Sequence, residues 1–189
     1  MNSSYRTNLW DKFLHIEHDN PSKFAISNPE AEFSFSEIKT KADSLSKALL
    51  DNGIVKGDVV AIFQDKSVAG FCLMLACLRI GAPYVNLDPG SPQERLKKML
   101  NTCEPALVVA CSQIKSNPLI EYSHPHKFIA IDDLKDGQTL NPYPVVTGTD
   151  PAYLMFTSGS TGLPKAAVIS HGALLNFIDW ARDRFELTP

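Results

Sequence analysis

The stretch DVVAIFQDKSVAGFCLMLACLRIGAPYVNL (residues 58–87) decides the fold class. It begins and ends with short apolar runs, DVVAIF and PYVNL, and between them a mostly apolar helix pattern starts near Ser67 and stops at Gly81. Strands that are apolar along their whole length are typical of parallel sheets whose two faces are both covered. The stretch therefore predicts a strand–helix–strand unit of an α/β protein.

The same alternation continues on the carboxyl side of this unit. The sequence SPQE predicts a helix with Ser91 as its N-cap and Pro92 in its first turn, and strands are predicted over residues 106–110 and 127–131. We therefore predict an α/β fold with a mostly parallel sheet and helices on both faces.

The amino-terminal part is predicted to add helices and a short pair of strands. A helix is expected over residues 5–18, and two strands are expected over residues 24–27 and 32–35, on either side of the turn sequence NPEA. Ser34 and Glu37 have the spacing of a capping box, which predicts that the next helix begins there.

Composition and charge exclude several classes of protein. The 189 residues carry a formal net charge of −3, so no basic surface for nucleic acid is expected. The most apolar stretch, residues 67–78, is much shorter than the roughly 20 residues of a membrane-spanning helix, so membrane insertion is not expected. The four cysteines, Cys72, Cys77, Cys103 and Cys111, lack metal-ligand spacing and are interpreted as core residues. We expect a cytoplasmic protein.

Residues 157–165, TSGSTGLPK, lie between the apolar runs AYLMF and AAVIS, which are both predicted to be buried strands. Glycines allow a backbone to approach a ligand closely, and successive N–H groups can form an anion-binding nest. Four hydroxyl groups and the Lys165 ammonium add hydrogen-bond donors and a positive charge. A polyphosphate requires this combination, so the loop is a candidate phosphate-binding site.

Two other interpretations of this loop fit less well. A flexible glycine–serine connector is seldom found between two buried strands. The phosphate loop of the common nucleoside triphosphatases requires G-x-x-x-x-G-K-[ST], but here Pro164 stands five residues after Gly159, and Ala166 follows the lysine.

The sequence TSGSTGLPK after AYLMF resembles the signature phosphate loop of the adenylate-forming (AMP-binding) enzymes, which include acyl-CoA synthetases, peptide-synthetase adenylation domains and luciferases. FSFSEI (33–38), CLRIGAPYVNLDPGSPQERL (77–96) and ISHGALLNF (169–177) resemble further motifs of that superfamily, in the same order. Two positions depart from the pattern, because Ala166 replaces a glycine and Asn86 replaces a proline. YVNLDPGSPQERL is more similar to amino-acid adenylation domains, including the D-alanine-carrier ligases, than to acyl-CoA synthetases.

The resemblance implies an activity and a set of ligands. An enzyme of this family activates a carboxylate substrate with ATP and Mg²⁺, releases pyrophosphate, and passes the acyl group to the phosphopantetheine thiol of a carrier protein or to coenzyme A. An acyl-CoA synthetase is therefore one alternative, and a non-catalytic nucleotide-binding relic or interaction module is another. The residues that would bind the phosphates are Thr157, Ser158, Gly159, Ser160, Thr161, Gly162 and Lys165. The Thr161 hydroxyl is the candidate Mg²⁺ ligand.

The downstream motifs of the family, NxYGxTE, TGD and a catalytic lysine near the C-terminus, do not occur in this sequence. We therefore expect residues 1–189 to be the N-terminal portion of an AMP-binding (adenylation) domain, with no catalytic residue of its own and no activity alone. An uncovered sheet edge or apolar face is expected for the same reason.

Three side chains near the end of the sequence are interpreted as structural. His171 follows a predicted N-cap serine and is expected to pack or cap as a neutral imidazole. Phe177 and Trp180 share one face of the predicted helix and are expected in the core or in the wall of an acid pocket.

Overall fold

The main sheet has six strands in the part of the chain that the structure describes. The computed structural model describes residues 8–28, 31–63, 66–110, 127–134, 142–158 and 164–187. Within these ranges the strand order is β6-β5-β3-β4-β7-β8, and every neighbouring pair is parallel except β7 with β8. The strands are β3 (Val60–Phe63), β4 (Tyr84–Leu87), β5 (Leu107–Ala110), β6 (Lys127–Ala130), β7 (Pro151–Ser158) and β8 (Pro164–Ser170). The predicted mostly parallel sheet is confirmed.

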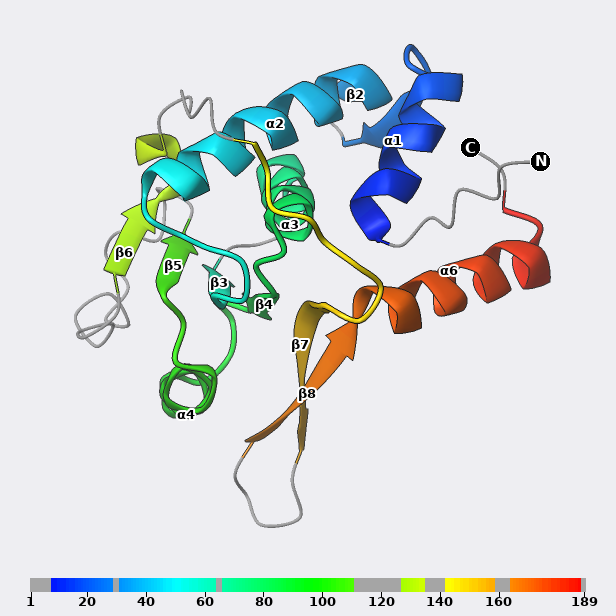
Figure 1. The fold of residues 1–189 in the computed structure, drawn as a ribbon. Helices are drawn as coiled ribbons and strands as arrows, with labels where there is room; N and C mark the ends of the chain where they lie inside the picture. Colours follow the sequence, from blue (N-terminus) through cyan, green and yellow to red (C-terminus); the bar gives the residue numbers. More distant parts are fainter. Residues whose placement is uncertain are drawn as a thin grey trace.

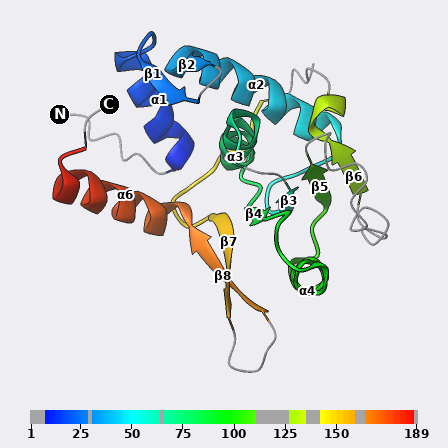
Figure 2. The same ribbon diagram turned by 180° about the vertical axis from the view of Figure 1, so that it is seen from behind.

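Helices cover both faces of this sheet. In Figure 1, α2 and α3 lie on one side of it and α4 lies on the other, and the reverse view in Figure 2 agrees. A separate antiparallel pair of strands, β1 (Phe24–Ser27) and β2 (Glu32–Ser34), precedes α2. The described helices are α1 (Leu9–Asp19), α2 (Phe35–Asp51), α3 (Val68–Ile80), α4 (Gln93–Cys103), α6 (His171–Phe185) and the short 3-10 helix η2 (Ile131–Asp133).

Burial on both faces of the sheet explains why β3 is apolar along its whole length. Successive side chains of a strand point to opposite faces, so Val60 and Ile62 pack in the core on the side of α2 and α3. Ala61 and Phe63 pack in a second core on the side of α4. All four side chains are buried, which is the physical reason for a strand with no polar positions. A third apolar cluster joins α1, α2, α3 and α6.

Helix starts show one confirmed and one wrong prediction. The capping box of α2 is present, since Ser34 Oγ accepts from the Glu37 N–H at 3.3 Å and Glu37 Oε2 accepts from the Ser34 N–H at 2.8 Å. The predicted Ser91 cap of α4 is wrong, because Pro92 is the N-cap and no side chain caps this helix. The Ser91 N–H instead donates to the Asp88 carbonyl at 2.9 Å, so Ser91 belongs to a turn that ends before the helix begins.

The β7–β8 hairpin differs from the rest of the sheet. It extends beyond the body of the sheet (Figure 1), and β8 is an edge strand with one neighbour. Two apolar side chains of the hairpin are exposed, Met155 at 48% and Val168 at 60%. The prediction that both flanking runs are buried strands is therefore wrong for β8, in which none of residues 166–170 is buried. It holds only in part for β7, where Ala152 is buried and Met155 is exposed.

An uncovered apolar surface is present on α6, as expected. Phe177, Trp180 and Phe185 are exposed, and their rings contact one another in sequence, with centroids 5.9 and 6.0 Å apart. The expectation that Phe177 and Trp180 lie in the core is therefore wrong. Their alternative role, in the wall of an acid pocket, stays a prediction.

Candidate functional site

The ends of the predicted phosphate loop lie opposite each other at the end of the hairpin. Thr157 pairs with Lys165 across β7 and β8, and Ser158 pairs with Pro164. Side chains that are directly opposite in an antiparallel pair point to the same face of the sheet, and those of Thr157 and Lys165 are both exposed. The pairing therefore places a hydroxyl side chain and an ammonium side chain on the same face of the hairpin. Gly159, Ser160, Thr161 and Gly162 lie outside the described residues.

The charge of this region favours an anion. Lys165 is the only charged residue between positions 151 and 170, so no carboxylate in this stretch of sequence competes for its ammonium group. The hairpin end is a place where a polyphosphate could be bound by a cation, short hydroxyls and backbone N–H groups.

One strand of the hairpin is anchored in the cores. Tyr153 packs against the third cluster, which joins α1, α2, α3 and α6, while Leu154 and Phe156 pack against the core on the side of α4. Because β7 is held on both faces in this way, its end carries Thr157 outward from a fixed strand. The partner strand β8 contributes Lys165 but little buried surface.

His171 joins the base of the hairpin to the first helix. It begins α6 directly after β8, and its side chain is fully buried. The Nδ1 atom accepts a hydrogen bond from the Leu9 N–H at 3.2 Å, so the ring is neutral with its proton on Nε2. Burial lowers the pKa of His171 to about 4, although the nearby Asp150 carboxylate opposes part of this shift. The expectation of a packed, neutral histidine is confirmed.

Asp150 lies immediately before β7 and is held by three donors. Its carboxylate accepts from the Lys56 ammonium at 2.7 Å, from the Thr147 N–H at 2.7 Å and from the Thr147 hydroxyl at 3.0 Å. These hydrogen bonds, first that of Lys56, lower the pKa of the Asp150 carboxyl. Sequence reasoning missed both Lys56 and Asp150. The Thr-x-x-Asp spacing of Thr147 and Asp150 is a local turn signal that could have revealed one half of this contact.

Comparison with known proteins identifies the family. Residues 14–189 match the sequence profile of the family described as AMP-binding enzyme. The chain belongs to this family. Its hairpin end, with Thr157 opposite Lys165, is thus the described part of an AMP-binding chain's candidate phosphate site.

Curated relatives of this AMP-binding chain are synthetases and ligases. It is 30% identical over 185 residues to vanchrobactin synthetase VabF of Vibrio anguillarum, and the match covers 96% of this chain and 6% of that protein. It is 28% identical over 191 residues to the L-proline–[L-prolyl-carrier protein] ligase of Pseudomonas fluorescens, and the match covers 96% of this chain and 38% of the ligase.

The same fold is found in a solved structure. The N-terminal subdomain of Klebsiella oxytoca NpsA, in complex with 3-hydroxyanthranilyl-AMSN, matches with a TM-score of 0.76 and 26% sequence identity. The match covers 87% of this AMP-binding chain and 41% of the NpsA chain. The chain thus spans less than half the length of each of these three similar proteins.

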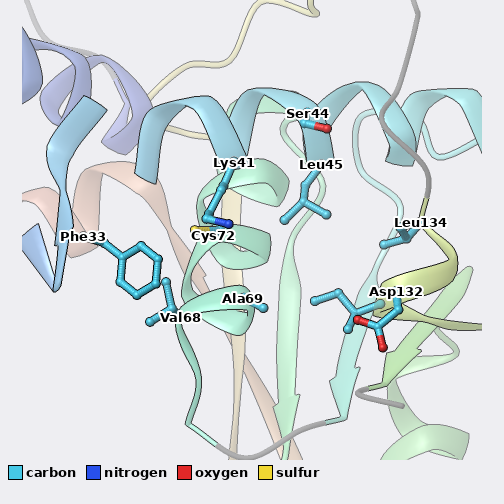
Figure 3. A pocket seen from close by; sticks show the side chains of 10 residues that line it. Phe33, Lys41, Ser44, Leu45, Val68, Ala69, Cys72, Asp132 and Leu134 are labelled. Carbon is cyan, nitrogen blue, oxygen red and sulfur yellow. The ribbon is translucent and has the colours of Figure 1, made fainter. Parts of the chain in front are cut away.

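A separate concavity of the AMP-binding chain lies away from the hairpin residues. It has a volume of about 390 Å³ and lies between α2, α3 and η2 (Figure 3). Figure 3 shows Lys41 and Asp132 on different sides of it, and the Lys41 ammonium is 5.8 Å from the centroid of the Phe33 ring. Of the predicted phosphate-binding residues that the structure describes, neither Thr157 nor Lys165 lines this pocket, so it is treated separately from the candidate site.

The described cysteines of the AMP-binding chain are core residues. Cys72, Cys77 and Cys103 are unpaired and buried. Burial raises the pKa of the Cys72 and Cys103 thiols to about 11 and raises that of Cys77 further, so all three are unreactive at neutral pH. Cys111 lies outside the described residues. No helix in the described ranges has the length and hydropathy required to cross a membrane.

Proposed function

We propose that the protein containing this chain activates a carboxylic acid, most readily an amino acid, by adenylation. The observation that carries the proposal is the pairing of Thr157 with Lys165 at the exposed end of a hairpin in an AMP-binding family member. The resemblance to amino-acid adenylation domains over residues 84–96 supports an amino acid as the substrate.

In the proposed reaction, a carboxylate oxygen of the acid attacks the α-phosphorus of ATP, and the bond to the β-phosphate oxygen breaks. The acyl-adenylate forms, and pyrophosphate leaves with the electron pair of the broken bond. The Lys165 ammonium and the Thr157 hydroxyl would hold the β- and γ-phosphate oxygens and stabilise the charge that develops on the leaving group. Mg²⁺, when bound, would neutralise phosphate charge, and the proposed protein ligand is the Thr161 hydroxyl.

The proposed acceptor of the acyl group is the phosphopantetheine thiol of a carrier protein. The thiol sulfur attacks the acyl carbon and releases its proton, and the bond from that carbon to the phosphate oxygen of the adenylate breaks. A thioester forms, and AMP leaves with the electron pair of the broken bond. The name of the similar proline ligase, which acts on a prolyl-carrier protein, supports this acceptor over coenzyme A. Such an ATP-dependent reaction fits the cytoplasm, where we place the protein.

We propose further that residues 1–189 form the N-terminal portion of an adenylation domain and are inactive alone. The shares of the similar proteins that the chain covers, 38% of the proline ligase and 41% of the NpsA chain, support this division. Adenylation requires ATP and the acid to be held in line, and such alignment contributes about 7–11 kcal/mol to catalysis. The phosphate-binding hairpin does not align the acid by itself.

The test is acid-dependent exchange of pyrophosphate into ATP, with a panel of amino acids, aryl acids and fatty acids. It is run on residues 1–189 and on the complete protein that contains them. The proposal predicts exchange by the complete protein only, with amino acids preferred and with the product captured by a carrier protein rather than by coenzyme A. Exchange by residues 1–189 alone contradicts the proposed division. An inactive complete protein instead supports a non-catalytic relic.

A further inference from the structure

The hairpin that carries Lys165 is paired with the parallel part of the main sheet at one residue position. The β7 strand pairs with β4 only at Tyr153, opposite Tyr84, whereas β3 pairs with β4 and with β5 through four residues each. Past Tyr153, β7 and β8 continue as a two-stranded ribbon, and a two-stranded hairpin by itself is only marginally stable. The direction of its end must therefore be determined by other contacts.

Side chains of β7 pack against the core on the side of α4, and α4 also contacts β8. A further set of contacts lies at the base of the hairpin, where β7 begins and α6 begins. The His171 N–H donates to the Asp150 carbonyl at 3.0 Å, and the Gly172 N–H donates to the Gly148 carbonyl at 2.8 Å. A Cβ atom at Gly172 would lie 3.0 Å from the Gly148 carbonyl oxygen, so a larger residue at this position would push the two backbones slightly apart. The two ends of the hairpin are thus bonded to each other.

The first helix then fixes this base to the rest of the protein. The Leu9 N–H, one of the donors that a helix N-terminus leaves unpaired, donates to His171 Nδ1. Asn8 Nδ2 donates to the Val146 carbonyl at 2.9 Å, and Lys12 forms an ion pair with Asp179 of α6. The start of α1 therefore contacts both the segment that leads into β7 and the helix that follows β8.

A second connection comes from the segment before β3. The Lys56 ammonium bonds to the Asp150 carboxylate at 2.7 Å and to the Val145 carbonyl at 2.8 Å. We call the four residues Leu9, Lys56, Asp150 and His171 the hairpin base. It links the chain on either side of the hairpin to the first helix and to the central sheet.

The His171 imidazole carries an energetic cost that a purely apolar side chain at this position would avoid. Its Nε2 atom is buried and has no hydrogen-bond partner in the described structure, and an unpaired buried donor is unfavourable. A leucine would fill similar space without this cost. The property that an imidazole adds here is the Nδ1 acceptor for the Leu9 N–H.

We infer that the hairpin base, and His171 within it, positions Thr157 and Lys165 for the triphosphate. The part of this inference that concerns triphosphate binding by Lys165 rests on the proposed function. The other part, that the hairpin base holds the hairpin in place, is independent of it. His171 and Lys56 are thus positioning residues, since neither belongs to the hairpin end.

The test compares His171→Leu, which removes the acceptor, with His171→Asn, whose Oδ1 can replace Nδ1. Backbone hydrogen exchange and MgATP affinity are measured in the complete protein. For His171→Leu we expect exchange in residues 151–158 and 164–170 to rise about tenfold, the change expected from one lost hydrogen bond. Exchange in β3 and β5 should not change, and MgATP binding should weaken roughly tenfold. His171→Asn should restore both to within about threefold.

Two further variants separate the possible failures. Lys56→Met changes a partly exposed side chain and keeps the test open if His171→Leu does not fold. It should produce the same selective rise in hairpin exchange, at about threefold. Lys165→Ala should weaken MgATP binding without changing hairpin exchange. An equal rise in all strands, or none in the hairpin, overturns the inference. If Lys165→Ala leaves MgATP affinity unchanged, the proposed function fails while the exchange result still decides the mechanical claim.

Discussion

The central strands and the β7–β8 hairpin differ in how deeply their residues are buried. In β3 and β5 every residue is buried, and each strand has neighbours on both sides. In the hairpin, one strand is an edge, Met155 and Val168 are exposed, and the only charged residue is Lys165. Burial is therefore concentrated in the central strands, whereas the candidate chemistry lies on a hairpin that contributes little burial at its end.

The largest expected effect comes from shortening a central side chain. Leu107 in β5 is completely buried, so Leu107→Ala should lower the free energy of unfolding by about 2–5 kcal/mol through lost burial and a cavity. The matched change in the hairpin, Val168→Ala, should cost less than about 0.5 kcal/mol because Val168 is 60% exposed. Urea denaturation of both variants measures the difference. Equal losses would remove the distinction between the two regions.

The next effect is a pH dependence that originates at the hairpin base. Burial lowers the His171 pKa from 6.5 in the unfolded chain to about 4 in the folded state. Between these two pH values the unfolded chain binds a proton at His171 and the folded chain does not. The stability is therefore fully present above pH 6.5, falls as the pH is lowered toward 4, and loses roughly 3 kcal/mol over that window. The Asp150 carboxyl, whose pKa is lowered, adds a loss only at more acidic pH.

The measurement for this effect is urea denaturation at several pH values between 4 and 7. His171→Asn has no ionisable group at this position and should show a much shallower slope than the unmodified protein. If the two slopes are the same, His171 is not the group that couples protonation to unfolding.

A smaller effect is expected at the start of α2, outside both regions. Ser34→Ala removes the hydroxyl that accepts from the Glu37 N–H, and loss of such a cap costs about 1 kcal/mol. Ser91→Ala at the start of α4 is the matched control, because the Ser91 side chain does not cap that helix. Thermal denaturation should show a lower midpoint for Ser34→Ala than for Ser91→Ala. The reverse order would contradict the described helix starts.

The sequence predicted local features well because their causes are local. The central strands start and end within a residue or two of their apolar runs, and Ser34 with Glu37 forms the expected capping box. The Ser91 cap failed because a turn from Asp88 competes for the same residues. The exposure of β8 could not be read from AAVIS, since an apolar run does not reveal whether a strand is central or at an edge.

Candidate site residues show the same division. The two strands predicted on either side of the motif are adjacent, as expected, but they extend into the predicted loop, because β7 ends at Ser158 and β8 begins at Pro164. The pairing of Thr157 with Lys165 follows from this longer hairpin. The hairpin base was not predictable, because the Leu9 N–H and His171 are 162 positions apart in the chain. Contacts of this kind depend on how helices dock, which no periodicity or spacing in the sequence specifies.

Whether the hairpin binds the phosphates is tested by Lys165→Ala in the complete protein, with acid-dependent pyrophosphate exchange and the free energy of unfolding measured on the same sample. Loss of charge-assisted contacts, each worth about 1.5–3 kcal/mol, should slow exchange roughly tenfold to a hundredfold. Because Lys165 is exposed, the free energy of unfolding should change by less than about 0.5 kcal/mol. Unchanged exchange, or a loss of stability that accounts for the slower exchange, would contradict the assignment of the phosphate chemistry to the hairpin.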